Sequence, residues 1–392
     1  MIPARELLDL RAEWQLDVGV IEKDYVLGWI LAAIGNEPDL AGTWIFKGGT
    51  CLRKCYYETY RFSEDLDFTV IDGGPETPED LMPIFRRVSD WLREQSGIEL
   101  LVDDRSFVRK KNKRSQPTTL GRLAYRGPNQ QHNLPKLKID ITSDEILAYA
   151  PDTRLVGHQY TDKPLPGNGV QCYAIVELFA EKIRALAERC RPRDLYDVVH
   201  MHRHPDLIGR APVVVAALEQ KCQHAGIPVP DAATIQSSPF RAEIEQEWEN
   251  MLGHQLPKPT PLFGDFWSAL DDVFAWLVGT LASPALARIE ARDLDPAWSP
   301  PLALTSWRLG FPLELVRYSG ANRMKVEIDY RAETGRRGPR IVEPYSLRQT
   351  KDGNLLLFVI NDRGLLRGYR LDRIAGVRPT TEIFSPRFRV EF

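Results

Sequence analysis

The sequence contains no long apolar run, so a membrane-spanning helix is not expected. Its first residues, MIPARELLDLRAEW, lack the basic start and apolar middle of a secretory signal. Cysteines are scarce, five in 392 residues, and none forms the CxxC pair that is typical of zinc sites. We therefore expect a cytoplasmic protein with no membrane partner and reduced thiols, in which Cys51 and Cys55 are small buried side chains.

An excess of basic charge is also missing. The net charge of -3 argues against a surface that is basic throughout and coats nucleic acid. No helix-turn-helix is evident at the N-terminus, which argues against a repressor. One local basic run could contact an RNA backbone through its phosphates, or could form the solvated tip of a hairpin. This run contains Arg109, Lys110, Lys111, Lys113 and Arg114.

The length of the chain predicts more than one domain, because a single hydrophobic core stops growing below this size. We expect one domain over residues 1–282, with a catalytic core at about 18–200 and a helical region at about 174–282. The proline-rich segment 283–301 is typical of a linker. Residues 302–392 show short apolar runs between glycine-containing turns, which predicts a small antiparallel β-domain.

Hydrophobic periodicity predicts an α+β fold, a small mixed sheet followed by a helical half. Apolar residues at helical spacing indicate an amphipathic helix over 18–34. The remaining predicted elements are strands near 44–46, 65–70, 99–102, 118–125 and 136–141, helices near 50–56 and 78–95, and further helices from 174 to about 281.

Asp65 and Asp67 form the most informative pair. Alternate residues of a strand point to the same face, so the two carboxylates can reach one metal ion while Leu66 and Phe68 point into the core. Carboxylate oxygens suit Mg²⁺ or Mn²⁺, and acidic metal sites support in-line displacement at phosphorus. The alternative is a surface strand that carries two solvated aspartates.

Two neighbouring features favour the first interpretation. Lys47, Gly48, Gly49 and Thr50 lie where a strand turns into a helix, and such a turn can bring backbone N–H groups close to a triphosphate. Asp140 lies on the polar face of the predicted strand KLKIDI, where it could complete the metal site.

Four sequence motifs along the chain resemble those of a known protein family. The run FKGGTCLRKCYYETYRFSEDLDFTV (46–70), the helix IEKDYVL (21–27), LKIDIT (137–142) and ELFAEKIRALAERCRPRDLYDVV (177–199) resemble, in order, the motifs of the AbiEii/AbiGii toxin family. That family belongs to the DNA polymerase beta-like nucleotidyltransferase superfamily. One departure is that the superfamily has Gly-Ser at the turn, where this chain has Gly-Gly-Thr.

The resemblance implies a role for individual residues. Gly48, Gly49 and Thr50 would contact phosphates, Asp65 and Asp67 would bind metal, and Lys182 would contact the triphosphate. Asp194 or Asp197 would act near the attacking hydroxyl, with Arg193 beside the nucleotide. From chemistry alone, Lys182 is suited to stabilising phosphate charge and Asp197 could act as a base, although a solvated lysine and a helix-start cluster of ion pairs are the alternatives.

The stretch 321–377 resembles the WYL domain, a small Sm-like β-barrel that senses ligands in bacterial regulators and defence proteins. EPYSL and YRLDRI carry the likeness, while Leu355, Leu356 and Leu357 replace the Trp-Tyr-Leu of the family name. Polar groups on its short strands could bind nucleotide or nucleic-acid phosphate, or the arginines could pair with Glu343 and Asp372. These groups are Tyr345, Ser346, Arg348, Arg370 and Arg373.

The sequence therefore predicts a metal-dependent nucleotidyltransferase that moves NMP from an NTP to a hydroxyl acceptor. The resemblance to MenT-like toxins implies an RNA acceptor, plausibly the tRNA 3′ end, and a setting of toxin–antitoxin control or phage defence by abortive infection. It also implies a cognate antitoxin. The alternatives are nucleotide transfer to a protein, and a non-catalytic regulator that senses nucleotide or nucleic acid.

Overall fold

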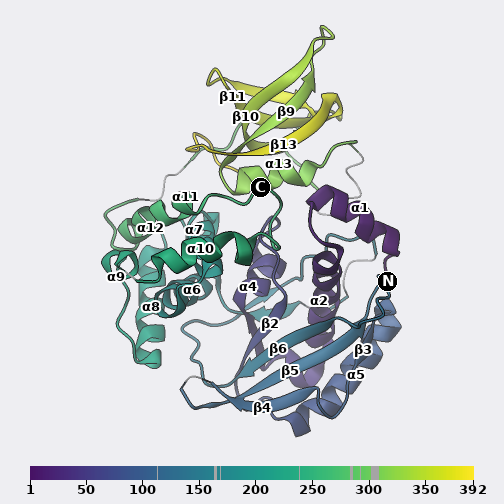
Figure 1. The fold of residues 1–392 in the computed structure, drawn as a ribbon, viewed down its shortest axis with the longest axis vertical. Helices are drawn as coiled ribbons and strands as arrows, with labels where there is room; N and C mark the ends of the chain where they lie inside the picture. The colour runs from purple at the N-terminus through teal and green to yellow at the C-terminus, as the bar shows by residue number, and fades with distance from the viewer. Residues whose placement is uncertain are drawn as a thin grey trace.

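The computed structural model describes residues 1–112, 114–162, 166–167, 169–237, 239–282, 286–291, 293–301 and 309–392. Lys113 of the basic run lies outside these ranges. Figure 1 shows a mixed sheet at the bottom, a group of helices at its side and a second sheet above both. Within the described ranges, none of the helices has the length and apolar character needed to cross a bilayer.

The larger sheet is mixed, as predicted. Its strand order is β3-β5-β6-β2-β1-β8-β7, with β4 paired to the first half of β5. The β2–β6 and β1–β8 pairs are parallel, and the other pairs are antiparallel. The strands are β1 (Trp44–Lys47), β2 (Asp65–Val70), β3 (Glu99–Leu101), β4 (Phe107–Lys111), β5 (Pro117–Arg126), β6 (Lys136–Thr142), β7 (Asp152–Arg154) and β8 (Val170–Cys172).

Helices α2 (Val18–Asn36) and α5 (Pro78–Ser96) pack against this sheet. Aromatic contacts identify the apolar face of the sheet. The Trp44 ring lies 4.9 Å from the ring of Phe68 and 6.0 Å from that of Phe85 on α5. Leu66 and Phe68 are fully buried, as the alternation along β2 predicts. The opposite face of β2 is thereby left to its two aspartates.

The prediction that the helix over 18–34 is amphipathic was wrong. Almost every residue of α2 from Ile21 to Ile34 is buried, including Glu22 and Asp24. A helix covered on all sides needs no polar stripe, so its two buried carboxylates require partners instead. Asp24 has them, because Arg53 Nε and Lys54 Nζ each lie 2.7 Å from its carboxylate oxygens.

The helical half follows as predicted and packs beside the sheet (Figure 1). It consists of α6 (Ile175–Arg189), α7 (Pro192–His202), α8 (Ala211–Ala225), α9 (Ala232–Gln236), α10 (Arg241–Leu252), α11 (Phe263–Ser268) and α12 (Leu270–Leu277). The sequence pattern did not predict α1 (Ala4–Trp14) or α3 (Pro38–Ala41). The helix expected at 50–56 begins earlier, as α4 (Gly48–Cys51), and continues as the π-helix η1 (Leu52–Tyr56).

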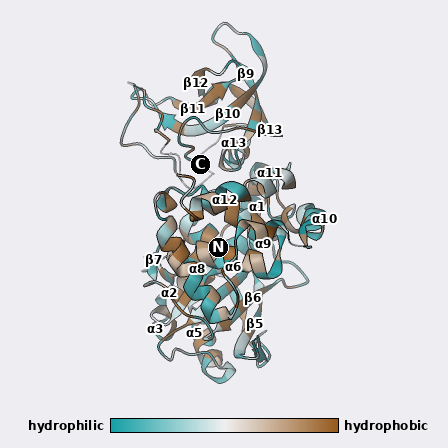
Figure 2. Cartoon of the chain, turned by 90° about the vertical axis from the view of Figure 1, so that its left-hand side faces the viewer, coloured by the Kyte–Doolittle hydropathy of each residue, from teal (hydrophilic) through white to brown (hydrophobic). Residues whose placement is uncertain are grey.

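The C-terminal strands do not close into the barrel that the sequence suggested. They form a five-stranded antiparallel sheet in the order β12-β11-β10-β9-β13, and β12 does not pair with β13 in this fully described part of the chain. Figure 2 shows this sheet standing clear of the larger body, with α13 (Leu313–Ala321) beneath it. The strands are β9 (Met324–Arg331), β10 (Arg337–Gln349), β11 (Leu355–Asn361), β12 (Leu366–Arg370) and β13 (Ile374–Ile383).

Part of the predicted linker packs on this sheet. Ile289 is buried in a small cluster with Tyr345, Phe358, Ile360 and Phe384. Leu294 forms a β-bridge with Thr350, and the Asp295 N–H donates to the Gln349 carbonyl. The described parts of 286–295 therefore run along the C-terminal domain, with Ile289 buried against it and most of the other described positions exposed.

Helix α13 joins the two bodies into one hydrophobic core. Phe311, Leu313, Val316 and Tyr318 belong to the same buried cluster as the core of the larger body. Polar contacts surround it: Arg317 Nη2 lies 2.7 Å from the Glu58 carboxylate, and the Tyr196 hydroxyl donates to Asn322 at 2.9 Å. The two bodies are thus held by both apolar and polar contacts.

A carboxylate at this junction predicts a pH effect. The Glu314 N–H donates to the Glu13 carboxylate at 3.0 Å, and burial, with the nearby Glu314 carboxylate, raises the pKa of Glu13 to about 7 from 4.5. The folded protein therefore holds this proton more tightly than the unfolded chain, so stability falls as pH rises from 4.5 through 7. Glu13→Gln keeps the acceptor oxygen and should stabilise the protein at pH 8 by roughly 1–2 kcal/mol, after allowing for solvent screening.

Urea unfolding at pH 8 and pH 4 measures this difference. The gain at pH 8 should largely disappear at pH 4, where Glu13 of the wild type is mostly protonated in both the folded and the unfolded protein. An equal gain at both pH values would show that the Glu13 charge is not its source.

Candidate active site

Three carboxylates share one face of the sheet. Asp65 and Asp67 lie two residues apart on β2, and the parallel register places Asp140 of β6 directly opposite Asp67. Burial raises the pKa of Asp67, and the nearby carboxylates of Asp140 and Asp65 raise it further. Burial also raises the pKa of Asp65, with Asp140 adding to the effect against the opposing charge of Lys138. The three acidic groups therefore lie close enough for their charges to repel one another.

Gly48 allows Asp67 to occupy its position. Its φ of +81° lies in the region that favours glycine, and a Cβ there would stand 2.3 Å from Oδ2 of Asp67. Any side chain at this turn would therefore displace the carboxylate. Glycine at this position therefore allows the turn to approach β2 closely.

The other turn residues are differently placed. A Cβ at Gly49 would lie 2.6 Å from Nη2 of Arg61. Thr50 is fully buried, and its hydroxyl donates to the backbone oxygen of Asp65 at 2.5 Å. In this geometry the Thr50 hydroxyl ties α4 to the start of β2.

A buried ion-pair cluster stands beside the carboxylates. Asp197 on α7 accepts two hydrogen bonds of 2.7 Å from Arg61, and Nζ of Lys182 on α6 lies 2.8 Å away. Burial alone would raise the pKa of Asp197, but Arg61 and Lys182 hold it below its usual range. The Tyr60 hydroxyl donates to the same carboxylate at 2.5 Å. The hydrogen-bonding capacity of Asp197 is therefore largely taken up.

Further cations lie where α6 ends and α7 begins. Arg189 forms two hydrogen bonds with Asp194, at 2.6 and 2.7 Å, and Lys182 lies 3.8 Å from the same carboxylate. Arg193 is half-buried, and its guanidinium interacts electrostatically with Asp65 as well as with Asp194. Charges of Lys182 and Arg189 act on Asp67. These cations of α6 and α7, the basic wall of the site, thus lie within electrostatic reach of the carboxylates on β2.

Two lysines are paired within the sheet. Lys47, predicted to bind nucleotide, forms an ion pair with Glu145, and Glu145 also accepts from the Tyr173 hydroxyl at 3.0 Å. Lys138 lies opposite Asp65 and pairs with Asp140. The third carboxylate therefore has a cationic partner in this structure.

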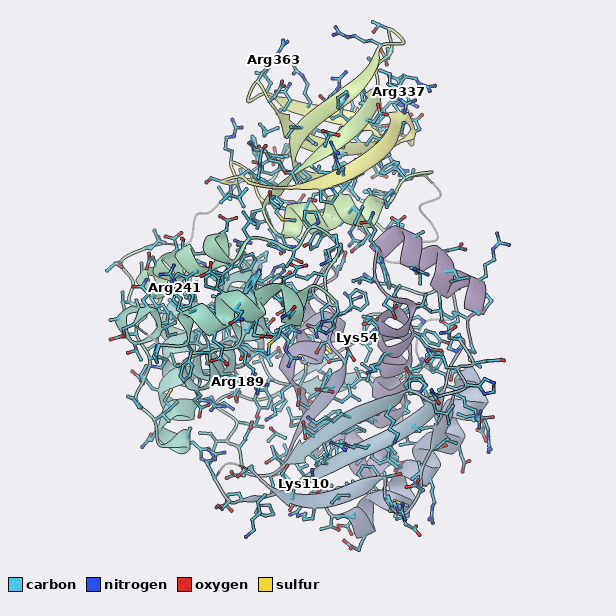
Figure 3. The ribbon with its side chains drawn as sticks, in the orientation of Figure 1. Lys54, Lys110, Arg189, Arg241, Arg337 and Arg363 are labelled. Carbon is cyan, nitrogen blue, oxygen red and sulfur yellow. The ribbon has the colours of Figure 1, made fainter. Side chains whose placement is uncertain are left out.

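The basic run of β4 divides between the two faces of the sheet. Arg109 pairs with Glu76 at 2.9 Å and Arg114 with Asp144 at 2.9 Å, while Lys110 and Lys111 are exposed. By strand register, Lys110 shares the face of the carboxylates. Figure 3 shows it at the end of the molecule farthest from the C-terminal sheet.

Register also reveals a basic path that the sequence did not suggest. Arg122 on β5 lies opposite Lys138, and Lys136 lies two residues before Lys138. All three share the face of Asp140, and Arg122 and Lys136 are exposed. A row of cations therefore leads away from the acidic site across the open face of the sheet.

The C-terminal candidates do not form one exposed cluster. Tyr345 and Ser346 are fully buried. Arg370 pairs with Asp372 at 2.7 Å, the alternative that the sequence left open. Arg373 pairs with Glu333, and Arg348 with Glu391.

Sequence reasoning missed Arg61 and Glu145, which position Asp197 and Lys47. Arg61 sits in the irregular stretch before β2, where no periodicity applies. Its position inside the family-like run 46–70 was the only available signal.

Comparison with known proteins gives two family matches. The model described as nucleotidyl transferase AbiEii toxin, type IV toxin–antitoxin system, matches residues 29–277, well over half of the chain. The WYL domain model matches residues 313–379. The curated proteins that were searched include no significant match.

Two solved structures are similar in part. MenT4, a nucleotidyltransferase toxin of Mycobacterium tuberculosis, is 20% identical, with a TM-score of 0.48 over 70% of this chain and 88% of that chain. The proteasome accessory factor B/C of Arthrobacter aurescens is 23% identical, with a TM-score of 0.18 over 26% of this chain and 14% of that chain.

Proposed function

Because the chain belongs to the AbiEii family of nucleotidyltransferase toxins and carries a WYL domain, we propose that it transfers NMP from an NTP to RNA. The 3′ end of tRNA is the leading acceptor. The observation that carries this proposal is the set of three carboxylates on one sheet face, opposite the cations of α6 and α7. A cognate antitoxin that blocks this face is the partner expected of such a toxin.

The residues present fit a divalent metal. Burial and mutual repulsion disfavour the charged forms of Asp65 and Asp67, and a bound cation would relieve both. Carboxylate oxygens are the ligands that Mg²⁺ and Mn²⁺ prefer, so Asp65, Asp67 and Asp140 would hold the ion. Such an ion neutralises triphosphate charge and aligns the reacting oxygens.

The basic wall would position the triphosphate. Lys182 and Arg193 face Asp67 and Asp65 from the other side of the site, so a polyphosphate between the walls would meet cations on one side. The turn at Gly48 would bring backbone N–H groups to the same place. With its oxygens held by Arg61 and Lys182, Asp197 orients this wall, and we propose for it a positioning role ahead of that of a base.

An RNA acceptor is supported by the row of cations. Lys138, Lys136 and Arg122 continue the open sheet face outward from the carboxylates. Phosphates of a strand lying along this row would meet one cation after another, which gives affinity without sequence preference.

The direct experiment is incubation of the full chain with each α-labelled NTP, Mg²⁺ and total RNA. RNase-sensitive label at an RNA 3′ end supports the proposal. Label that survives RNase but is lost with protease would identify a protein acceptor, and no metal-dependent label would refute transfer.

Arg122→Ala tests the RNA path. One lost phosphate contact should weaken RNA binding roughly three- to ten-fold and lower the slope of log affinity against log salt by about one, with NTP binding unchanged. Arg86→Ala is the matched control, because Arg86 is also an exposed arginine but lies on α5, beyond the opposite face of the sheet. Equal effects of both substitutions would remove the RNA path from the proposal.

Control by the C-terminal domain has a structural basis. Asn322, at the end of α13, accepts from the hydroxyl of Tyr196, the neighbour of Asp197 in sequence. Arg317 of the same helix pairs with Glu58, three residues before Arg61. We propose that a ligand of the WYL domain acts on the basic wall through α13.

A further inference from the structure

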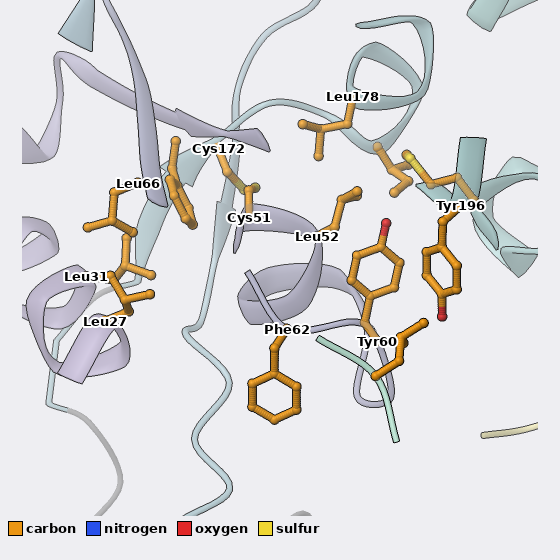
Figure 4. Close-up of a cluster of buried hydrophobic side chains, with 14 of the residues drawn as sticks. Leu27, Leu31, Cys51, Leu52, Tyr60, Phe62, Leu66, Cys172, Leu178 and Tyr196 are labelled. Carbon is orange, nitrogen blue, oxygen red and sulfur yellow. The ribbon is translucent and has the colours of Figure 1, made fainter. Parts of the chain in front are cut away.

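Three of the five cysteines lie close together near the turn at Gly48. Cys51 ends α4, Cys55 lies in η1, and Cys172 ends β8. Their sulfur atoms all lie within 4.8 Å of one another. Figure 4 shows Cys51 and Cys172 together among buried hydrophobic side chains such as Leu52 and Leu66.

From this convergence we propose that Cys51, Cys55 and Cys172 form a binding site for a thiophilic metal ion, foremost Zn²⁺. Zinc bonds to thiolate sulfur at about 2.3 Å, which separates ligand sulfurs by roughly 3.8 Å in a tetrahedral site. The observed separations need only a small contraction to reach this value. Each thiol releases one proton as its metal–sulfur bond forms.

The arrangement suits a metal better than a disulfide. Cys51 and Cys55 are four residues apart in a continuous helical segment, where Cβ atoms stand about 5–6 Å apart. A disulfide needs a Cβ separation of about 3.5–4.5 Å, so this pair would have to distort the helix. A bond from Cys172 to either partner would leave the third thiol unused. One ion engages all three.

The surroundings provide a second shell and an entry path. The Cys172 thiol lies 3.3 Å from the Asp152 carbonyl oxygen, and the Tyr56 hydroxyl lies 3.7 Å from its sulfur. Cys51 and Cys172 are fully buried, but Cys55 is half-buried and lines a cavity of about 790 Å³ together with Tyr56. The cavity would admit the ion and supply water as a fourth ligand.

A metal ion bound at this site would stabilise the turn at Gly48. Cys51 follows Thr50 directly, and Phe46 of β1 pairs with Cys172. A metal held by these thiols would link α4, η1 and β8, the elements on which the Gly48 turn rests. The site is distinct from the carboxylate site on β2 and would hold its ion whether or not nucleotide transfer is observed.

Cadmium titration of the full chain, purified with reductant and chelator, tests this proposal. Cd²⁺ is expected to bind one per chain with an ultraviolet thiolate-to-metal absorption band, and Zn²⁺ in large excess should compete for the same site. Cys55→Ser, at the cavity wall, should weaken binding by roughly a hundred-fold or more without unfolding the protein, and Cys172→Ser should do the same.

Cys222→Ser is the matched control, since Cys222 is a buried free thiol on α8. It should keep both the band and the one-to-one stoichiometry. Absence of the band in wild type, equal loss in the Cys222→Ser control, or a disulfide among the three cysteines in the protein as purified would each overturn the proposal.

Discussion

Asp67→Asn is expected to reduce nucleotide transfer by roughly a thousand-fold or more, the effect of losing several kcal/mol of transition-state stabilisation. The same substitution should leave the metal-free protein at least as stable as wild type at pH 7. Burial and the carboxylates of Asp140 and Asp65 raise the pKa of Asp67 above 3.8, so its charge costs folding free energy, and this cost grows as pH rises through that range. Label transfer and urea unfolding of the same preparation measure both effects.

Loss of activity combined with retained or increased stability is typical of a functional charge cluster. Asp65→Asn should behave in the same way, because burial and Asp140 also raise the pKa of Asp65. Asp206→Asn, at a surface 3-10 turn outside the site, serves as the control and should transfer label normally. Normal transfer by Asp67→Asn would exclude the carboxylates from the reaction.

Asp197→Ala is expected to have the largest effect on stability. It removes the carboxylate that both Arg61 and Lys182 contact, and leaves these buried cations without their shared partner. Breaking a buried ion pair from one side costs about 3–5 kcal/mol. Because the pKa of Asp197 is depressed in the folded state, this stability is fully present above 3.8 and is lost as pH falls below it.

Asp194→Ala, one turn earlier on α7, is the matched comparison. Asp194 is equally buried, but its main partner Arg189 keeps 43% of its side chain exposed and can turn to water. A clearly smaller loss of unfolding free energy at pH 7 is expected for this variant. Equal losses would show that burial of the carboxylate, and not the pair with Arg61, sets the cost.

The chemistry of β2 could be predicted from the sequence because strand alternation is local. Asp65 and Asp67 had to share a face once Leu66 and Phe68 were assigned to the core, and the register with β6 brings Asp140 beside them. Lys182 and Asp197 were identified through the resemblance, with which their chemistry was compatible, since nothing in their spacing links α6 and α7 to β2. That Lys182 acts on Asp67 and pairs with Asp197 is a property of the tertiary structure.

Other features depend on packing that no local pattern encodes. Arg61 lies in an irregular stretch, and its partner Asp197 is 136 residues away. Glu145 pairs with Lys47, 98 residues away in the chain. The amphipathic reading of α2 failed because charged residues at helical spacing are normally solvated, whereas here Asp24 is neutralised by Arg53 and Lys54 inside the core.

For the C-terminal domain, the sequence pattern predicted the strands but not whether they close into a barrel. Its alternating runs predicted antiparallel strands correctly, but closure depends on whether the outer strands meet. The bulges in β10 and β13 shift the register, and β12 and β13 remain separate edges. The burial of Tyr345 likewise follows from its packing in one cluster with Phe384 and Ile289, and not from strand periodicity alone.

Manganese binding tests the role of the three carboxylates most directly. Electron paramagnetic resonance can count free Mn²⁺ as the full chain and a non-hydrolysable NTP analogue are added. Wild type is expected to bind Mn²⁺ tightly in the presence of the analogue, and Asp67→Asn to lose this binding while remaining folded. Equal Mn²⁺ binding by the two proteins would contradict a metal site built on Asp65, Asp67 and Asp140.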